Sequence, residues 1–152
     1  MRSYLIDTSS LANVGDGTSA SSDRWHVIDR LIAEGRLKTV HQVFNELKAV
    51  DPEAHRRLKP RKKAMVVRSN RVGLMKMTGV IAHRHPSMAH PRSRKDRADP
   101  YVVAAAKLNG FCVVTDESTR RKGHMPSVCD AEEVAHCCLE DLLAKEWRAK
   151  RG

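Results

Sequence analysis

Short apolar runs and amphipathic stretches alternate along the chain. The apolar runs at residues 3–7, 37–40, 111–115 and 135–138 are typical of strands buried in a parallel sheet. Between them, apolar residues recur at helical spacing, and Gly35 and Gly110 follow two of these stretches as helix terminators. Helices are expected at 8–14, from Ser22 or Asp23 to 34, at 43–47, 51–63, from Ser69 or Asn70 to 81, at 98–110, 125–134 and 139–147. A loop is expected at 83–95, where two prolines interrupt the pattern.

This alternation of strands and helices predicts an α/β fold, a three-layer α/β/α sandwich with a central, mainly parallel sheet. The length of 152 residues suits one domain, and no internal repeat or composition break divides residues 1–152.

The composition excludes several protein classes. No apolar run approaches the ~18–20 residues that a membrane span requires, so no membrane association is expected. The four cysteines lack CxxC spacing, and Cys137 and Cys138 are adjacent, which does not fit a disulfide framework. A reducing, cytoplasmic location is therefore expected.

The positive charge is concentrated in residues 55–97, which we call the basic segment. It contains 14 of the 28 Lys and Arg residues but one of the 18 acidic residues. Such a segment favours phosphate binding, with RNA as the leading partner, although a solvated face is the simpler alternative. Since aromatic residues make up only 4% of the chain, binding is expected to rest on phosphate contacts. The candidate RNA-binding residues are Arg61, Lys62, Lys63, Arg68, Arg71, Arg92, Arg94 and Lys95.

Acidic residues lie where the predicted strands end. Asp7 closes the first strand, Asp116 and Glu117 follow the third, and Glu46 and Asp99 lie on helices that flank the same edge. Ligands of open parallel sheets bind at the carboxyl ends of the strands. Crowded carboxylates need a cation, and oxygen ligands suit Mg²⁺ or Mn²⁺. Taken singly, Asp99 could cap its helix, Glu46 could be solvated, and the 116–117 pair could open a turn.

The segments YLIDTSSL, VFNEL, ADPYVVAAAK and CVVTDE, in that order, resemble the four acidic signatures of PIN domains. The resemblance extends over residues 3–147. It implies an α/β/α metal-dependent ribonuclease that uses water as the nucleophile and leaves a 5′-phosphate and a 3′-hydroxyl. Many small bacterial members are toxins of type II toxin–antitoxin pairs, so the resemblance also implies a cognate antitoxin and a homodimer.

The resemblance assigns roles to individual residues. Asp7 would be the first metal ligand, Glu46 the second acid and Asp99 the third. The fourth acid is either Asp116 or Glu117, and both are retained as candidate catalytic and metal-binding residues. Candidate hydroxyls that orient metal or water are Thr8, Ser9 and Thr115.

Two functions of different classes follow. The first is a metal-dependent endoribonuclease, the toxin of a toxin–antitoxin pair. The second is a non-catalytic PIN-like module that binds RNA or protein through the basic segment.

Overall fold

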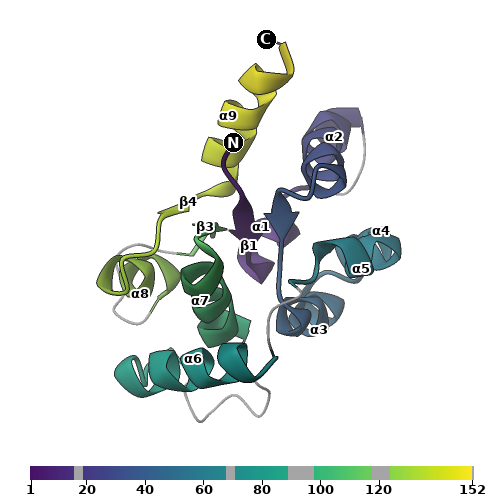
Figure 1. Ribbon diagram of the computed structural model, residues 1–152. Coiled ribbons are helices and arrows are strands. Elements are labelled where there is room, and N and C mark those ends of the chain that lie inside the picture. The colour runs from purple at the N-terminus through teal and green to yellow at the C-terminus, as the bar shows by residue number, and fades with distance from the viewer. Residues whose placement is uncertain (16–18, 68–70, 89–97, 118–123, 152) are drawn as a thin grey trace.

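A parallel sheet forms the centre of the molecule (Figure 1). This computed structural model describes residues 1–15, 19–67, 71–88, 98–117 and 124–151, and for residues 19, 20, 71 and 148–151 it describes the backbone alone. The described strands are β1 (Tyr4–Ile6), β2 (Leu37–Lys38), β3 (Cys112–Val114) and β4 (His136–Cys137). They are arranged in the order β2-β1-β3-β4, and every pairing is parallel. All four lie within the apolar runs expected to form strands.

Helices cover both faces of the sheet. Helix α2 (Ser19–Ala33) contacts α9 (Leu139–Arg151) on one face, and α7 (Ala98–Asn109) contacts α8 (Met125–Ala131) on the other, so the fold is the expected three-layer α/β/α sandwich. Helix α6 (Arg71–Arg84) packs against the outer side of α7 (Figure 1). The described helices are α1 (Thr8–Ala12), α2 (Ser19–Ala33), α3 (His41–Val50), α4 (Pro52–Leu58), the 3₁₀ helix η1 (Lys59–Arg61), α5 (Lys62–Met65), α6 (Arg71–Arg84), α7 (Ala98–Asn109), α8 (Met125–Ala131) and α9 (Leu139–Arg151). Among them, none has both the length and the apolar character needed to cross a bilayer.

Continuous apolar sequence is what a strand covered on both faces requires. Each residue of β1 and of β3 is buried, and Leu5 pairs with Val113 at the centre of the sheet. A strand with one solvated face would alternate apolar and polar residues, and neither strand does. The two glycine terminators are also confirmed: Gly35 and Gly110 have φ values of +72° and +69°.

The start of α2 differs from the prediction. The helix begins at Ser19, so neither Ser22 nor Asp23 caps it. The side chain of Ser21 packs against Gly15, where a Cβ atom would have no room. Ser21 is the third residue of the helix. The expected caps of α6, Ser69 and Asn70, lie outside the described residues; α6 itself extends to Arg84, beyond the expected helix end at residue 81 and into the predicted loop at 83–95.

A buried ionic cluster ties the last helix to the sheet. The carboxylate of Glu146, on α9, is 3% exposed and accepts hydrogen bonds from Arg36 Nη2 at 2.6 Å and from the Tyr4 hydroxyl at 2.9 Å. Burial alone would raise the pKa of Glu146, but the hydrogen bonds from Arg36 and Tyr4 outweigh burial and hold this pKa below its usual value. The cluster joins β1, the residue before β2, and α9.

Removing the positive charge of Arg36 should therefore destabilise the protein. The substitution Arg36→Met leaves a buried carboxylate without its main partner, and we expect the free energy of unfolding to fall by about 3 kcal/mol. Urea denaturation at pH 7 measures this loss. The double variant Arg36→Met/Glu146→Leu should recover at least half of it, because no charge is left unpaired. A loss of less than about 1 kcal/mol in the single variant would show that the cluster does not hold α9 in place.

Candidate active site

Asp7 is the most enclosed acid at the carboxyl edge of the sheet. It directly follows β1, caps α1 and is 3% exposed. Thr115, the residue after β3, donates its hydroxyl to Asp7 Oδ2 at 2.7 Å. On the other oxygen, Oδ1 accepts from the Ser9 hydroxyl at 2.7 Å and from the Ser10 N–H at 3.2 Å. The pairing of β1 with β3 thus brings residues 7 and 115 together.

The environment of Asp7 opposes its ionisation. Burial raises the pKa of Asp7 to about 6, and the hydrogen bonds from Thr115, Ser9 and Ser10 offset only part of that effect. The negative charge of Glu117 raises this pKa further. A carboxyl whose pKa is raised by burial and by a second charge is a candidate for a functional role.

The carboxylate of Asp116 joins three elements of the fold. It accepts from the Ser10 hydroxyl at 3.1 Å, from Asn13 Nδ2 at 2.6 Å and from the N–H of Leu139 at 2.9 Å. Its two oxygens therefore connect the end of β3 to α1 and to the first residue of α9. This arrangement is that of a structural clamp.

Glu117 differs from Asp116 in its surroundings. Its Oε2 accepts from the N–H of Met125 at 2.8 Å, at the start of α8, and its own N–H donates to the hydroxyl of Thr115 at 3.3 Å. Thr115 therefore contacts both Asp7 and Glu117. Of the two alternatives for the fourth acid, Glu117 is the one whose charge acts on Asp7.

Glu46 is held between the start of α1 and the start of α7. Its Oε1 accepts from the Thr8 hydroxyl at 2.7 Å, and its Oε2 accepts from the N–H of Ala98 at 2.8 Å. Asp99 is the second residue of α7, so it is not the N-cap that the sequence suggested. Glu46 binds the N–H of the first residue in this helix, a role that a capping side chain would otherwise have.

The oxygen atoms of these side chains are suitable ligands for a hard cation, but they already accept hydrogen bonds from donors within the protein. Asp7, Glu46, Asp116 and Glu117 each accept hydrogen bonds from protein donors. Across the described ranges, no group of three or more His, Cys, Asp or Glu side chains is arranged to hold a metal. Carboxylate and hydroxyl oxygens are nevertheless the ligands that Mg²⁺ and Mn²⁺ prefer, and a cation beside Asp7 would favour its ionised form.

Comparison with known proteins places the chain in a family. Residues 4–149 match a family described as a domain of unknown function, DUF4411. The chain belongs to the DUF4411 family. No curated protein matches it. The match includes every acid of the candidate site.

Two residues of this DUF4411 site were missed by the sequence analysis. Ser10 and Asn13 hold Asp116, and the sequence contained a signal for them. They are three positions apart on or just after α1, so they lie on the same side of the helix. Polar residues at that spacing beside a strand end indicate a shared hydrogen-bond partner.

The basic segment is less uniformly charged than its composition suggests. On η1 and α5, Arg61 lies 3.5 Å from the carboxylate of Asp29, and Lys62 Nζ lies 5.8 Å from the centre of the Phe44 ring. Lys63 is exposed. Arg68, Arg92, Arg94 and Lys95, and the side chain of Arg71, lie outside the described residues.

Part of the basic segment is neutralised on the far side of α6. Arg84, His85 and Lys107 all contact the buried carboxylate of Glu132, at 2.9, 2.7 and 2.8 Å. Burial alone would raise the pKa of Glu132, but the hydrogen bonds from Lys107 and His85 and the nearby charges outweigh it and lower this pKa to about 2.

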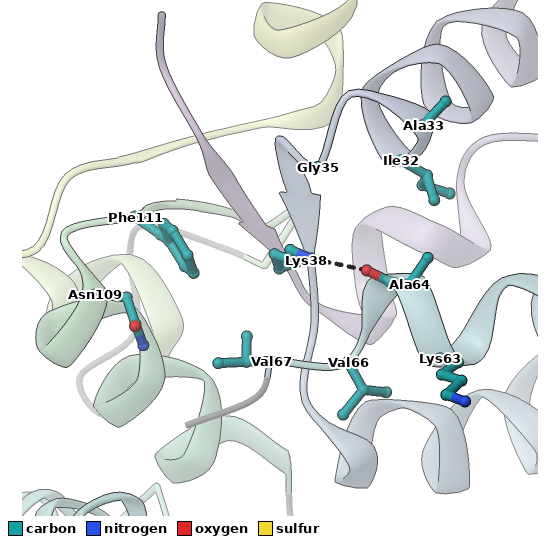
Figure 2. A pocket seen from close by; sticks show the side chains of 10 residues that line it. All are labelled: Ile32, Ala33, Gly35, Lys38, Lys63, Ala64, Val66, Val67, Asn109 and Phe111. Atoms are coloured by element: carbon teal, nitrogen blue, oxygen red, sulfur yellow. Dashed lines mark hydrogen bonds between the residues drawn. The ribbon is translucent and has the colours of Figure 1, made fainter. Parts of the chain in front are cut away.

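A cavity of about 550 Å³ borders Lys63 at the outer edge of β2 (Figure 2). Lys38 lies in it and donates to the carbonyl of Ala64 at 2.8 Å. Val66 and Val67 form part of its wall and also line two adjacent cavities, of about 430 and 460 Å³. Among the described lining residues of these three cavities there is no acid.

The enclosure of Asp7 should reduce stability at neutral pH. The folded state raises the pKa of Asp7 from 3.8 to about 6, so folding disfavours the ionised form. The resulting cost is small below pH 4, grows as the pH rises from 4 to 6, and is constant above pH 6 at about 3 kcal/mol, taking ~1.4 kcal/mol per pH unit.

Asp7→Asn should therefore stabilise the protein at pH 8 by up to about 3 kcal/mol and leave its stability near pH 4 almost unchanged. Chemical denaturation in the presence of a chelator measures both values. Glu53→Gln, at an exposed position on α4, is the matched control and should show no such difference. Equal effects of Asp7→Asn at the two pH values would contradict the raised pKa.

Proposed function

We propose that this protein is an endoribonuclease that hydrolyses RNA phosphodiester bonds with Mg²⁺ or Mn²⁺. The observation that carries the proposal is the enclosure of Asp7. It lies at the carboxyl edge of a parallel sheet, bound to Thr115 and repelled by the charge of Glu117. A buried aspartate with a raised pKa beside a second acid is costly to the fold, and metal binding would offset that cost.

The residues of the site have distinct roles in this proposal. Asp7 and Glu117 would hold the cation, with Glu46 and Asp99 close to the start of α7. Such a cation, when bound, neutralises charge that develops on the scissile phosphate. Ser9 and Thr115 orient the carboxylate of Asp7 by their hydroxyl hydrogen bonds. In the same way, Thr8 orients the carboxylate of Glu46.

Cations of the basic segment would hold the RNA on either side of the scissile bond. Lys59 and Lys63 are exposed on the segment that borders β2. Backbone contacts of this kind position a substrate without selecting a base sequence.

A non-catalytic module that binds RNA or protein is the second candidate. One observation favours it: the carboxylates of Asp7, Glu46, Asp116 and Glu117 accept protein hydrogen bonds, and Asp116 forms a clamp. In this alternative, the acids hold α1, α7 and α9 to the sheet, and binding is a property of the basic segment alone.

The proposed partner is an antitoxin protein, and the proposed compartment is the cytoplasm. The cavities around Val66 and Val67 offer apolar walls with Lys38 and Lys63 beside them and no described acid (Figure 2). Such a surface suits a protein segment that carries both apolar and acidic side chains. A homodimer is proposed from the family resemblance.

Loss of the first acid should abolish cleavage. With Mg²⁺ or Mn²⁺ present, Asp7→Asn is expected to cut RNA at least about 100-fold more slowly than the wild type. Residues that only support a metal ligand lower affinity or activity by ~10–100-fold when they are replaced, and replacing the ligand itself should lower activity by at least as much. Gel analysis of a labelled RNA measures the rate. Glu53→Gln should cut at the wild-type rate. RNA binding without cleavage by the wild type, over a range of both metals, would instead favour the non-catalytic module.

RNA binding should weaken when two lysines of the basic segment are replaced, the half-buried Lys62 and the exposed Lys63. For Lys62→Gln/Lys63→Gln, the slope of log K against log salt concentration should become shallower by up to about 1.4, at ~0.7 for each phosphate contact to a single strand. Fluorescence anisotropy at several salt concentrations gives this slope. An unchanged slope would exclude these two lysines from the RNA contact.

A further inference from the structure

Two cysteines lie side by side on the last two strands of the sheet. Val114 of β3 pairs with Cys137 of β4, and Cys112 lies two residues before Val114 on the same face of its strand. Cys112 and Cys137 are therefore diagonal neighbours on adjacent parallel strands. Their sulfur atoms are 3.9 Å apart, which is van der Waals contact between two free thiols.

The surroundings of this pair favour oxidation at Cys112. Its thiol contacts that of Cys137, and this contact lowers the pKa of Cys112 and raises that of Cys137, while the charges of Arg2, His136 and Lys145 also lower the pKa of Cys112. Cys112 is buried and Cys137 is half-buried, so peroxide would reach the pair from the side of the edge strand β4. The thiolate is the form that peroxides attack. Cys129 provides a contrast, because burial raises its pKa to about 12.

We propose that Cys112 and Cys137 form a reversible oxidative modification site, in which hydrogen peroxide converts the two thiols to a disulfide between β3 and β4. In the first step, the sulfur of Cys112 attacks peroxide, the O–O bond breaks, and a sulfenic acid and one water form. In the second step, the sulfur of Cys137 attacks that of Cys112, the S–O bond breaks, and a second water leaves with the thiol proton. The two sulfurs give up two electrons, which reduce the peroxide.

The position of the pair makes the disulfide strained and easily reduced. The sulfurs must approach from 3.9 Å to about 2.05 Å. Diagonal neighbours on adjacent strands have Cα atoms ~7–8 Å apart, which is more than a disulfide spans, so β4 has to shift along β3. The shift is feasible because β4 is an edge strand of two residues that pairs with β3. Strained disulfides have higher reduction potentials and suit a switch in a reducing compartment.

A shift of β4 would reach the candidate active site through one hydrogen bond. The carbonyl of Cys137 accepts from the N–H of Thr115 at 2.9 Å, and the hydroxyl of Thr115 holds Asp7. Oxidation of the pair would thus loosen the contact that orients Asp7. The thiol chemistry itself is independent of the proposed nuclease activity.

Thiol counting on the full-length, reduced protein tests the proposal. After treatment with hydrogen peroxide, the protein is alkylated under denaturing conditions and its mass is measured. We expect two fewer alkylated cysteines than in the untreated protein, and full recovery after dithiothreitol. Cys138→Ser, at a half-buried neighbour of the pair, should behave as the wild type does, whereas Cys112→Ser and Cys137→Ser should form no intramolecular disulfide. Circular dichroism verifies that each variant is folded.

Peptide mapping decides between the outcomes. A reducible link between residues 112 and 137 supports the proposal. Full alkylation of Cys112 after peroxide, a link to Cys138 in its place, or a disulfide between two chains would overturn it. The thiol measurements use no RNA, so the two proposals are tested separately. If no disulfide forms, the nuclease proposal is unaffected. If the protein does not cleave RNA, the disulfide proposal is unaffected. Amide exchange at Thr115 tests the connection to the site: oxidation should accelerate it, and unchanged exchange would contradict the coupling.

Discussion

The enclosure of one carboxylate by two adjacent strand ends is the constraint on which the rest of the site depends. Asp7 cannot be solvated where it lies, so its oxygens must be satisfied by Ser9, Ser10 and Thr115. That requirement fixes the first turn of α1 relative to the end of β3. In the same turn, the hydroxyl of Ser10 donates a hydrogen bond to Asp116, and Asp116 also accepts one from the N–H of Leu139 at the start of α9. Three elements that are distant in sequence are thus positioned by a chain of hydrogen bonds beginning at one side chain.

The architecture was predictable from the sequence because it depends on local patterns. Residues 4–6 are continuously apolar because their strand is covered on both faces, which is the pattern of strands in parallel sheets. Gly35 and Gly110 end their helices in conformations with positive φ, which a single residue type signals. The position of Asp7 at the end of β1 followed from the same reasoning.

Other features could not be predicted because they depend on partners from distant parts of the chain. The difference between Asp116 and Glu117 is set by Leu139 and Met125, whose N–H groups come from the starts of two later helices. Helix α2 begins at Ser19, earlier than the cap candidates Ser22 and Asp23 suggested. Likewise, the count of cations in the basic segment gave no sign that Asp29 and Glu132 neutralise part of it.

The short outer strands of the sheet have a consequence for how copies of this protein can associate. The edge at β4 consists of His136 and Cys137, and the edge at β2 is partly closed by the bridge between Thr39 and Val66. An extended ladder of free backbone groups, which would let two sheets join edge to edge, is therefore missing from both described borders. Among the described residues, a symmetric pairing of two chains would therefore use side chains outside these strands, where specificity comes from shape and charge rather than from the backbone.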